Sequence, residues 1–201
     1  MNTAARPIHR LANLTIAALA IDALASLSKT GALWAGYMDG LADLSLAIRD
    51  PLGPRGLALA YVVLKMATGI VFIAWFARAF HNAVALGLRR EGVGPVGVWF
   101  LPILNLFGPY LMMRDVWSRS FTDPATDTPT TGLGWVRAWW AAWTGVFVVP
   151  LVASAWTDPF DHVTRAILDG PLRAIAAVCA IVMVHRLSRR QTRRVAGVGT
   201  F

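Results

Sequence analysis

Hydrophobic residues fall into long, nearly uncharged stretches that are separated by short polar segments. Four of these stretches approach the roughly 20 residues that a helix needs to cross a bilayer. They predict four transmembrane helices, at about residues 11–28, 57–76, 135–155 and 172–187. The chain is therefore predicted to be an all-α membrane protein with a single integral membrane domain, residues 1–201.

A fifth apolar stretch is interrupted by prolines. Residues 93–113 carry no charge but contain Pro95, Pro102 and Pro109, spaced seven apart, with glycines around them. A proline in a helix interior costs about 3 kcal/mol because it removes a backbone donor and clashes with the preceding turn. Broken backbone at membrane depth survives only where protein or water surrounds it. We therefore expect a broken, Pro/Gly-rich element at about 93–117, re-entrant or interfacial, on the cytoplasmic side.

The polar segments predict how the helices end. Lys29 and Thr30 are expected to end the first span. Residues 33–48 show the spacing of an amphipathic helix, which either lies on the outer membrane surface or packs on the bundle as a loop. The second helix is expected to run on into solvent over residues 77–86, with Gly87 as its stop signal.

Composition supports a membrane protein. Hydrophobic residues make up 56% of the chain and charged residues only 15%, whereas soluble domains carry about 25% charged residues. Nine tryptophans are present, and Trp135, Trp139 and Trp143 are predicted to form an interfacial anchor belt at the start of the third span. The single cysteine, Cys179, excludes an internal disulfide.

The net charge of +8 is explained by membrane topology rather than by nucleic-acid binding. Most of the 19 Lys and Arg residues fall in segments on the same side as the termini. Cytoplasmic loops carry the Lys/Arg excess, so both termini are predicted to be cytoplasmic. A crossing by the broken element would place the C-terminal arginines outside, which the charge distribution opposes.

One group of residues resembles a known family. The resemblance covers about residues 70–120 best, beginning with Trp75, Arg78 and Asn82. Its core motif comprises Trp99, Phe100, Pro102, Asn105, Pro109, Tyr110, Arg114 and Trp117. This pattern resembles a bacterial multi-span membrane family known only as domain of unknown function 4328. The resemblance implies a multi-pass protein of the bacterial inner membrane, and it implies no activity.

Two ionisable residues lie inside predicted spans. Asp22 and Lys65 each cost roughly 2.5–3.5 kcal/mol at the centre of a membrane helix. They lie at similar predicted depths on consecutive antiparallel spans, so we expect an intramembrane ion pair. A proton or ion pathway is the alternative.

The broken element offers further polar candidates. Asn105 is expected to satisfy backbone groups freed by Pro102 and Pro109, although a contact with a ligand in a pocket remains open. Arg114 and Asp115 close the element, where a local ion pair or a contact with lipid phosphate is expected.

Basic and imidazole side chains gather near the cytoplasmic ends of the spans. Lipid headgroup contact is predicted for the arginines that follow the fourth span, Arg189, Arg190, Arg193 and Arg194. His9, His81 and His185 raise the hypothesis of haem or metal binding, but interfacial hydrogen bonding explains them as well, and no cofactor or metal is predicted.

No phosphate-binding glycine loop, nucleophile elbow or HExxH helix occurs in the sequence, so an enzyme is disfavoured. We expect a non-catalytic accessory or scaffold subunit that contacts a membrane-protein partner, a second copy of itself or lipid. The alternatives are a small oligomeric transporter or channel and a haem-binding redox subunit. The sequence names neither partner nor substrate.

Overall fold

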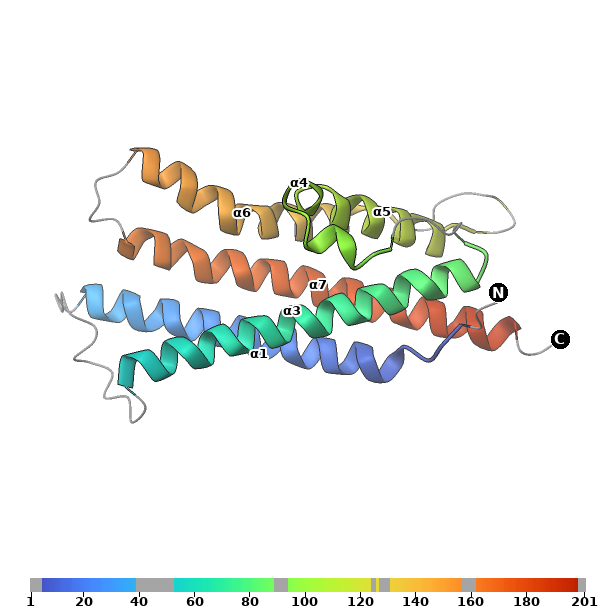
Figure 1. The fold of residues 1–201 in the computed structure, drawn as a ribbon, viewed down its shortest axis with the longest axis horizontal. Coiled ribbons are helices and arrows are strands. Elements are labelled where there is room, and N and C mark those ends of the chain that lie inside the picture. Colours follow the sequence, from blue (N-terminus) through green and yellow to red (C-terminus); the bar gives the residue numbers. More distant parts are fainter. Residues whose placement is uncertain are drawn as a thin grey trace.

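The protein folds into helices, as predicted. The computed structural model describes residues 5–38, 53–88, 94–123, 126, 131–156 and 162–198. Within these ranges the elements, labelled as in Figure 1, are α1 (His9–Met38), α3 (Gly53–Ala85), the 3-10 turn η1 (Gly97–Trp99), α4 (Pro102–Asn105), α5 (Gly108–Ser120), α6 (Gly134–Trp156) and α7 (His162–Val198). No β-strand occurs among these elements.

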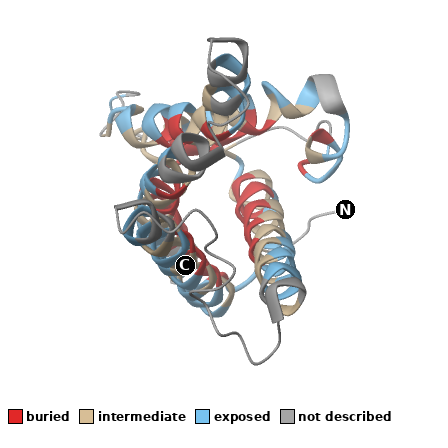
Figure 2. Ribbon diagram, turned by 90° about the vertical axis from the view of Figure 1, so that its left-hand side faces the viewer, coloured by how far each residue is buried: buried red, intermediate tan, exposed pale blue. Residues whose placement is uncertain are grey.

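Helix α7 is the centre of the bundle, because it packs most extensively against α1 and then against α6. The two chain ends lie at the same end of the molecule, here called the inner end (Figure 1). An end-on view shows the buried residues on the sides of the helices that face one another (Figure 2). An even number of long helices brings the termini together in this way.

The seam of α1 explains its close packing on the neighbouring helices. The buried residues of α1 and the residue just before it alternate in steps of four and three along one stripe, and half of them have small side chains: Ile8, Ala12, Thr15, Leu19, Asp22 and Ser26. This is the spacing of a coiled-coil seam. Small residues at such positions let backbones approach closely, as in membrane helix pairs.

Helix α3 ends as its sequence predicts. Gly87 has a positive φ of 69°, a conformation that costs glycine little. The Gly87 amide donates to the Val84 carbonyl and the Leu88 amide to the Ala83 carbonyl, both at 2.9 Å. These bonds form a Schellman motif, which satisfies the last carbonyls of the helix. The helix runs on past residue 76 as predicted, with Ala79, Phe80 and Ala83 buried against the bundle.

Three helices are long and apolar enough to cross a membrane, over His9–Ala32, Ala58–Ala85 and Leu168–Ala196. They contain the first, second and fourth predicted spans. The third prediction, 135–155, coincides with α6, which is not among the three candidates found within the described residues.

The helices are longer than the predicted spans. Helix α1 continues past Lys29 and Thr30 to Met38, whereas the candidate membrane span ends near the predicted position, at Ala32. The Lys29 ammonium lies 5.0 Å from the centre of the Tyr61 ring, which gives a polar residue a partner within the helix pair. Residues 33–38 belong to α1, and the rest of the predicted amphipathic segment lies outside the described residues.

The proline-rich stretch is broken into three short helical pieces, η1, α4 and α5. Figure 1 shows that it turns back in the middle of the molecule at α4, and that α5 returns toward the inner end. Pro102 is the first residue of α4 and Pro109 lies in the first turn of α5. Proline is favoured at these positions because its missing N–H has no partner in the first turn anyway.

The face of α6 that was predicted as an anchor belt packs against other aromatic residues of the bundle. Trp139 is only 3% exposed, and its ring centre lies 5.7 Å from that of Phe72 on α3. Trp140 and Trp143 stack at 4.8 Å, and Trp143 meets Trp99 edge-on at 6.2 Å. Spacing along a helix shows which residues share a face, and here Trp139 and Trp143 on that face meet Phe72 of α3 and Trp99 of η1.

Candidate functional site

The structure brings Asp22 and Lys65 together between α1 and α3. Lys65 Nζ lies 2.7 Å from Asp22 Oδ1, and the two side chains are only 21% and 13% exposed. Asp22 Oδ1 nevertheless has no hydrogen-bond partner among the described residues, so the contact lacks hydrogen-bond alignment. Coulomb attraction depends on distance rather than on this angle, and the contact is an ion pair.

Ser26 completes the cluster. Lys65 Nζ donates to Ser26 Oγ at 2.8 Å, and Ser26 Oγ donates to the Asp22 carbonyl at 2.7 Å. Because a hydroxyl has one proton, the Tyr61 hydroxyl at 3.2 Å donates to Ser26 Oγ. The Lys65 ammonium also lies 4.7 Å from the centre of the Tyr61 ring. The polar groups of this cluster bond to one another at the contact between α1 and α3 and so hold the two helices together.

A second polar cluster joins α3 to α7 and to the residues before α1. The backbone N–H of Arg6 donates to Asn82 Oδ1, and Asn82 Nδ2 donates to the Arg6 carbonyl, both at 2.9 Å. Arg78 donates to the Pro7 carbonyl at 3.3 Å. Trp75 Nε1 donates to Ser188 Oγ at 2.9 Å, so each of the three motif residues on α3 fastens a segment distant in sequence.

The aromatic residues of the broken element lock it between α3 and α6. Trp99 meets Phe76 edge-on at 6.1 Å, and Tyr110 stacks on Trp140 at 6.1 Å. Trp117 is fully buried, and its Nε1 donates to the Gly132 carbonyl at 3.3 Å. Phe100 and Phe107 differ from these residues because they are 72% and 61% exposed.

The side-chain oxygen of Asn105 has no described partner in the broken element. Asn105 Oδ1 is buried and has no hydrogen-bond partner within the described part of the chain.

A glycine is required at position 108, because an added Cβ would lie 2.9 Å from Val98 Cβ of η1. Asp115 pairs at 2.6 Å with Arg119, four residues further on, while Arg114 is exposed.

The arginines at the end of α7 separate into two kinds. Arg190 and Arg194 donate to the Ser120 and Thr122 carbonyls, at 3.3 and 2.8 Å. Arg189 and Arg193 are exposed and line two cavities.

The three histidines do not form one site. His9 and His185 line the same cavity, whereas His81 is bonded to the Ala77 carbonyl of its own helix at 2.7 Å. Among the described residues, no group of three or more His, Cys, Asp or Glu side chains is placed to hold a metal ion.

Several residues of these clusters were not singled out in the sequence. Ser26, Ser188 and Gln191 are buried polar residues, and Gln191 Nε2 donates to the Ala79 carbonyl at 2.9 Å. Ser26 lies four residues after Asp22, a spacing that places both on one face. This spacing could have identified Ser26 from the sequence. Gln191 lies within the arginine-rich segment, where its sequence position does not distinguish it.

The described residues form an all-helical fold with three helices long and apolar enough to cross a membrane, and the polar clusters join these helices to one another. A family model described as "Domain of unknown function (DUF4328)" matches residues 52–189. The chain belongs to this family, which confirms the resemblance seen in the sequence. No curated protein and no solved structure matches the chain.

Proposed function

We propose that this chain is a non-catalytic accessory or scaffold subunit of the bacterial inner membrane that contacts a membrane-protein partner, a second copy of itself or lipid. The observation that carries the proposal is the set of large apolar side chains exposed on the helices. The largest exposures on α3 and α6 include those of Leu59, Val63, Met66, Phe147 and Leu151. Such faces are stable in contact with lipid or with another apolar helix.

The proposed topology has four spans and cytoplasmic termini. Helix α6 has 23 residues, with Arg137 as its only charged residue, near the start. At 1.5 Å per residue it is about 35 Å long, which exceeds the roughly 30 Å hydrocarbon core. The return of the broken element toward the inner end (Figure 1) supports a re-entrant element rather than a fifth span.

Photo-crosslinking in living cells tests the scaffold proposal. A photoreactive residue at Leu59 or Phe147, both exposed, should give a discrete protein adduct, whereas the same residue at buried Ala79 should not. Adducts to lipid alone from both exposed positions would contradict a protein partner.

A small oligomeric transporter is the second candidate, because buried polar residues line the contact between α1 and α3. Thr15, Asp22, Ser26 and Thr68 are all buried there. Ion flux into vesicles containing the purified protein, lost in Asp22→Asn, would favour transport over a scaffold. The haem hypothesis has only the shared cavity of His9 and His185 in its favour, and an absorption spectrum of the purified protein tests it directly.

A further inference from the structure

The four arginines at the end of α7 make different contacts. The chain of α5 ends at Ser120, and the carbonyls just there receive the guanidinium groups of Arg190 and Arg194. The last carbonyls of a helix carry partial negative charge, so cations are stabilising there. Arg190 and Arg194 therefore fasten the end of α5 to α7 and are committed to the fold.

The other two arginines, Arg189 and Arg193, do not hold α5 in this way. Arg193 makes no hydrogen bond or ion pair with any residue that the structure describes. Arg189 is hydrogen-bonded to His185 in that part of the chain, with 3.4 Å between Nη1 and Nε2. A guanidinium can only donate, so the imidazole nitrogen accepts. His185, Arg189 and Arg193 are four residues apart, and all three are exposed.

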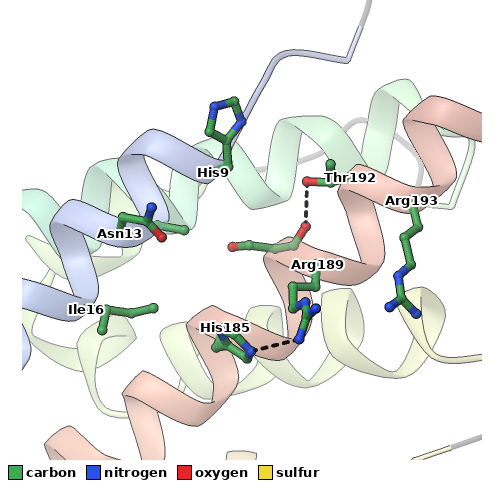
Figure 3. A pocket seen from close by; sticks show the side chains of 9 residues that line it. His9, Asn13, Ile16, His185, Arg189, Thr192 and Arg193 are labelled. Atoms are coloured by element: carbon green, nitrogen blue, oxygen red, sulfur yellow. Dashed lines mark hydrogen bonds between the residues drawn. The ribbon is translucent and has the colours of Figure 1, made fainter.

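These three residues line two cavities at the inner end. A cavity of about 350 Å³ lies between α1 and α7, with His9, Asn13 and Ile16 across from the α7 residues (Figure 3). A cavity of about 450 Å³ on the other side is also lined by Arg186 and Arg190. Neither lining includes an acidic side chain among the described residues, so the positive charge has no counter-ion there.

The first cavity changes in character along its length. Ala12 and Ile16 are one and two turns further into the span than His9, and they line the same space. A ligand there meets guanidinium groups at the inner end and apolar side chains toward the middle of the bundle. This arrangement matches a phosphate-bearing headgroup joined to an acyl chain.

We propose that Arg189, Arg193 and His185 bind the phosphate of an anionic lipid, whose first acyl carbons lie over Ala12 and Ile16. Arginine suits this role because its planar fork donates two parallel hydrogen bonds to phosphate. The site rests on the membrane placement proposed above. The sequence predicted lipid contact for four arginines. The proposal keeps Arg189 and Arg193 as lipid ligands and assigns Arg190 and Arg194 to the fold.

Thermal unfolding of the full chain in neutral detergent tests the site. Dioctanoyl phosphatidylglycerol is titrated in, with dioctanoyl phosphatidylcholine and inorganic phosphate as separate arms. We expect a saturable rise in Tm with phosphatidylglycerol only. Arg189→Gln/Arg193→Gln should raise the half-saturating concentration about tenfold or more, because hydrogen bonds to charged groups are lost.

A matched control removes two exposed arginines outside both cavities. Arg10→Gln/Arg137→Gln should keep the wild-type half-saturating concentration, since neither residue lines the site. Arg194→Gln, at a position that lines neither cavity, should lower Tm without lipid, because its bond to the Thr122 carbonyl is lost, and should leave the lipid response in place. If Arg189→Gln/Arg193→Gln does not fold, Arg193→Gln alone serves, because Arg193 has no described contact to lose.

Three results would overturn the proposal. The first is an unchanged lipid response in Arg189→Gln/Arg193→Gln, and the second is an equal loss in the control pair. The third is an equal rise in Tm with inorganic phosphate alone, which would make the ligand a free anion. Failure of membrane placement is detected separately by a reporter at the C-terminus.

Discussion

Separating Asp22 from Lys65 should strongly destabilise the protein. The changes are Asp22→Asn, Lys65→Met and the two together. At 2.7 Å the attraction between unit charges is about 6 kcal/mol for an effective dielectric constant of 20. Removal of ions from water offsets much of this attraction, so the pair itself adds little net stability.

Removing one partner is costly because it leaves the other charge buried and unpaired. Each single change should cost about 3–5 kcal/mol in the free energy of unfolding, which corresponds to a fall in Tm of roughly 6–20 °C for a chain of this size. The double change removes both charges and should restore most of the loss. A deficit of about 1–2 kcal/mol should remain, because the hydrogen bond from Lys65 to Ser26 is also lost.

The assay is thermal unfolding in one neutral detergent, followed by tryptophan fluorescence. Lys29→Met is the matched control, since Lys29 is exposed and touches the same Tyr61 ring at 5.0 Å. It should cost no more than about 1 kcal/mol. Losses from the single changes that add in the double variant to within about 0.5 kcal/mol would refute the pairing, because independent sites add in that way.

Three further predictions test the packing and the topology. Gly170→Ala should cost about 1–3 kcal/mol in unfolding free energy, because a Cβ there would overlap Thr30 Oγ1 and lie 2.9 Å from the Ser26 carbonyl oxygen. The control Gly145→Ala, whose nearest new neighbour is Leu172 Cδ2 at 3.5 Å, should be neutral or slightly stabilising. Equal losses in the two variants would contradict the close contact of α7 with α1 at Gly170. Asn82→Leu should cost about 2 kcal/mol and speed hydrogen exchange at the Arg6 amide, since both bonds to Arg6 are lost, whereas His81→Leu should leave that amide protected. A reporter fused after Phe201 should be active only in the cytoplasm, and periplasmic activity would contradict the four-span topology.

The sequence predicted the helices better than their ends. Long apolar stretches locate α1, α3 and α7, because burial in lipid requires such stretches. Hydropathy does not locate where a helix stops, since polar residues beyond the span can continue it when a neighbour receives them. Lys29 illustrates this point, because its ammonium lies over Tyr61 and α1 continues to Met38. The end of α3 at Gly87 could be predicted, because a glycine after the last helical residues is a signal in the local sequence.

The site was partly predictable for a related reason. Charged residues within apolar spans are conspicuous, so Asp22 and Lys65 could be singled out without a structure. Ser26 carries no such signal, although it contacts Lys65 directly. The face of Trp139 was identifiable from its spacing, but its neighbour was not, because aromatic residues suit both a membrane interface and a packed core.

The prolines explain how η1 and α5, the two ends of the broken element, pack against the core. An unbroken helix over these residues would direct its side chains around a single axis. Breaks before α4 and α5 instead let η1 and α5 approach α3 and α6 separately. Trp99 then meets Phe72 and Phe76, Tyr110 stacks on Trp140, and Trp117 is buried beside Phe121. Gly108 permits the close contact between the pieces, since Val98 occupies the space that a side chain would need. The free energy lost by breaking the helix is thus offset by aromatic contacts that a continuous helix could not make on both sides.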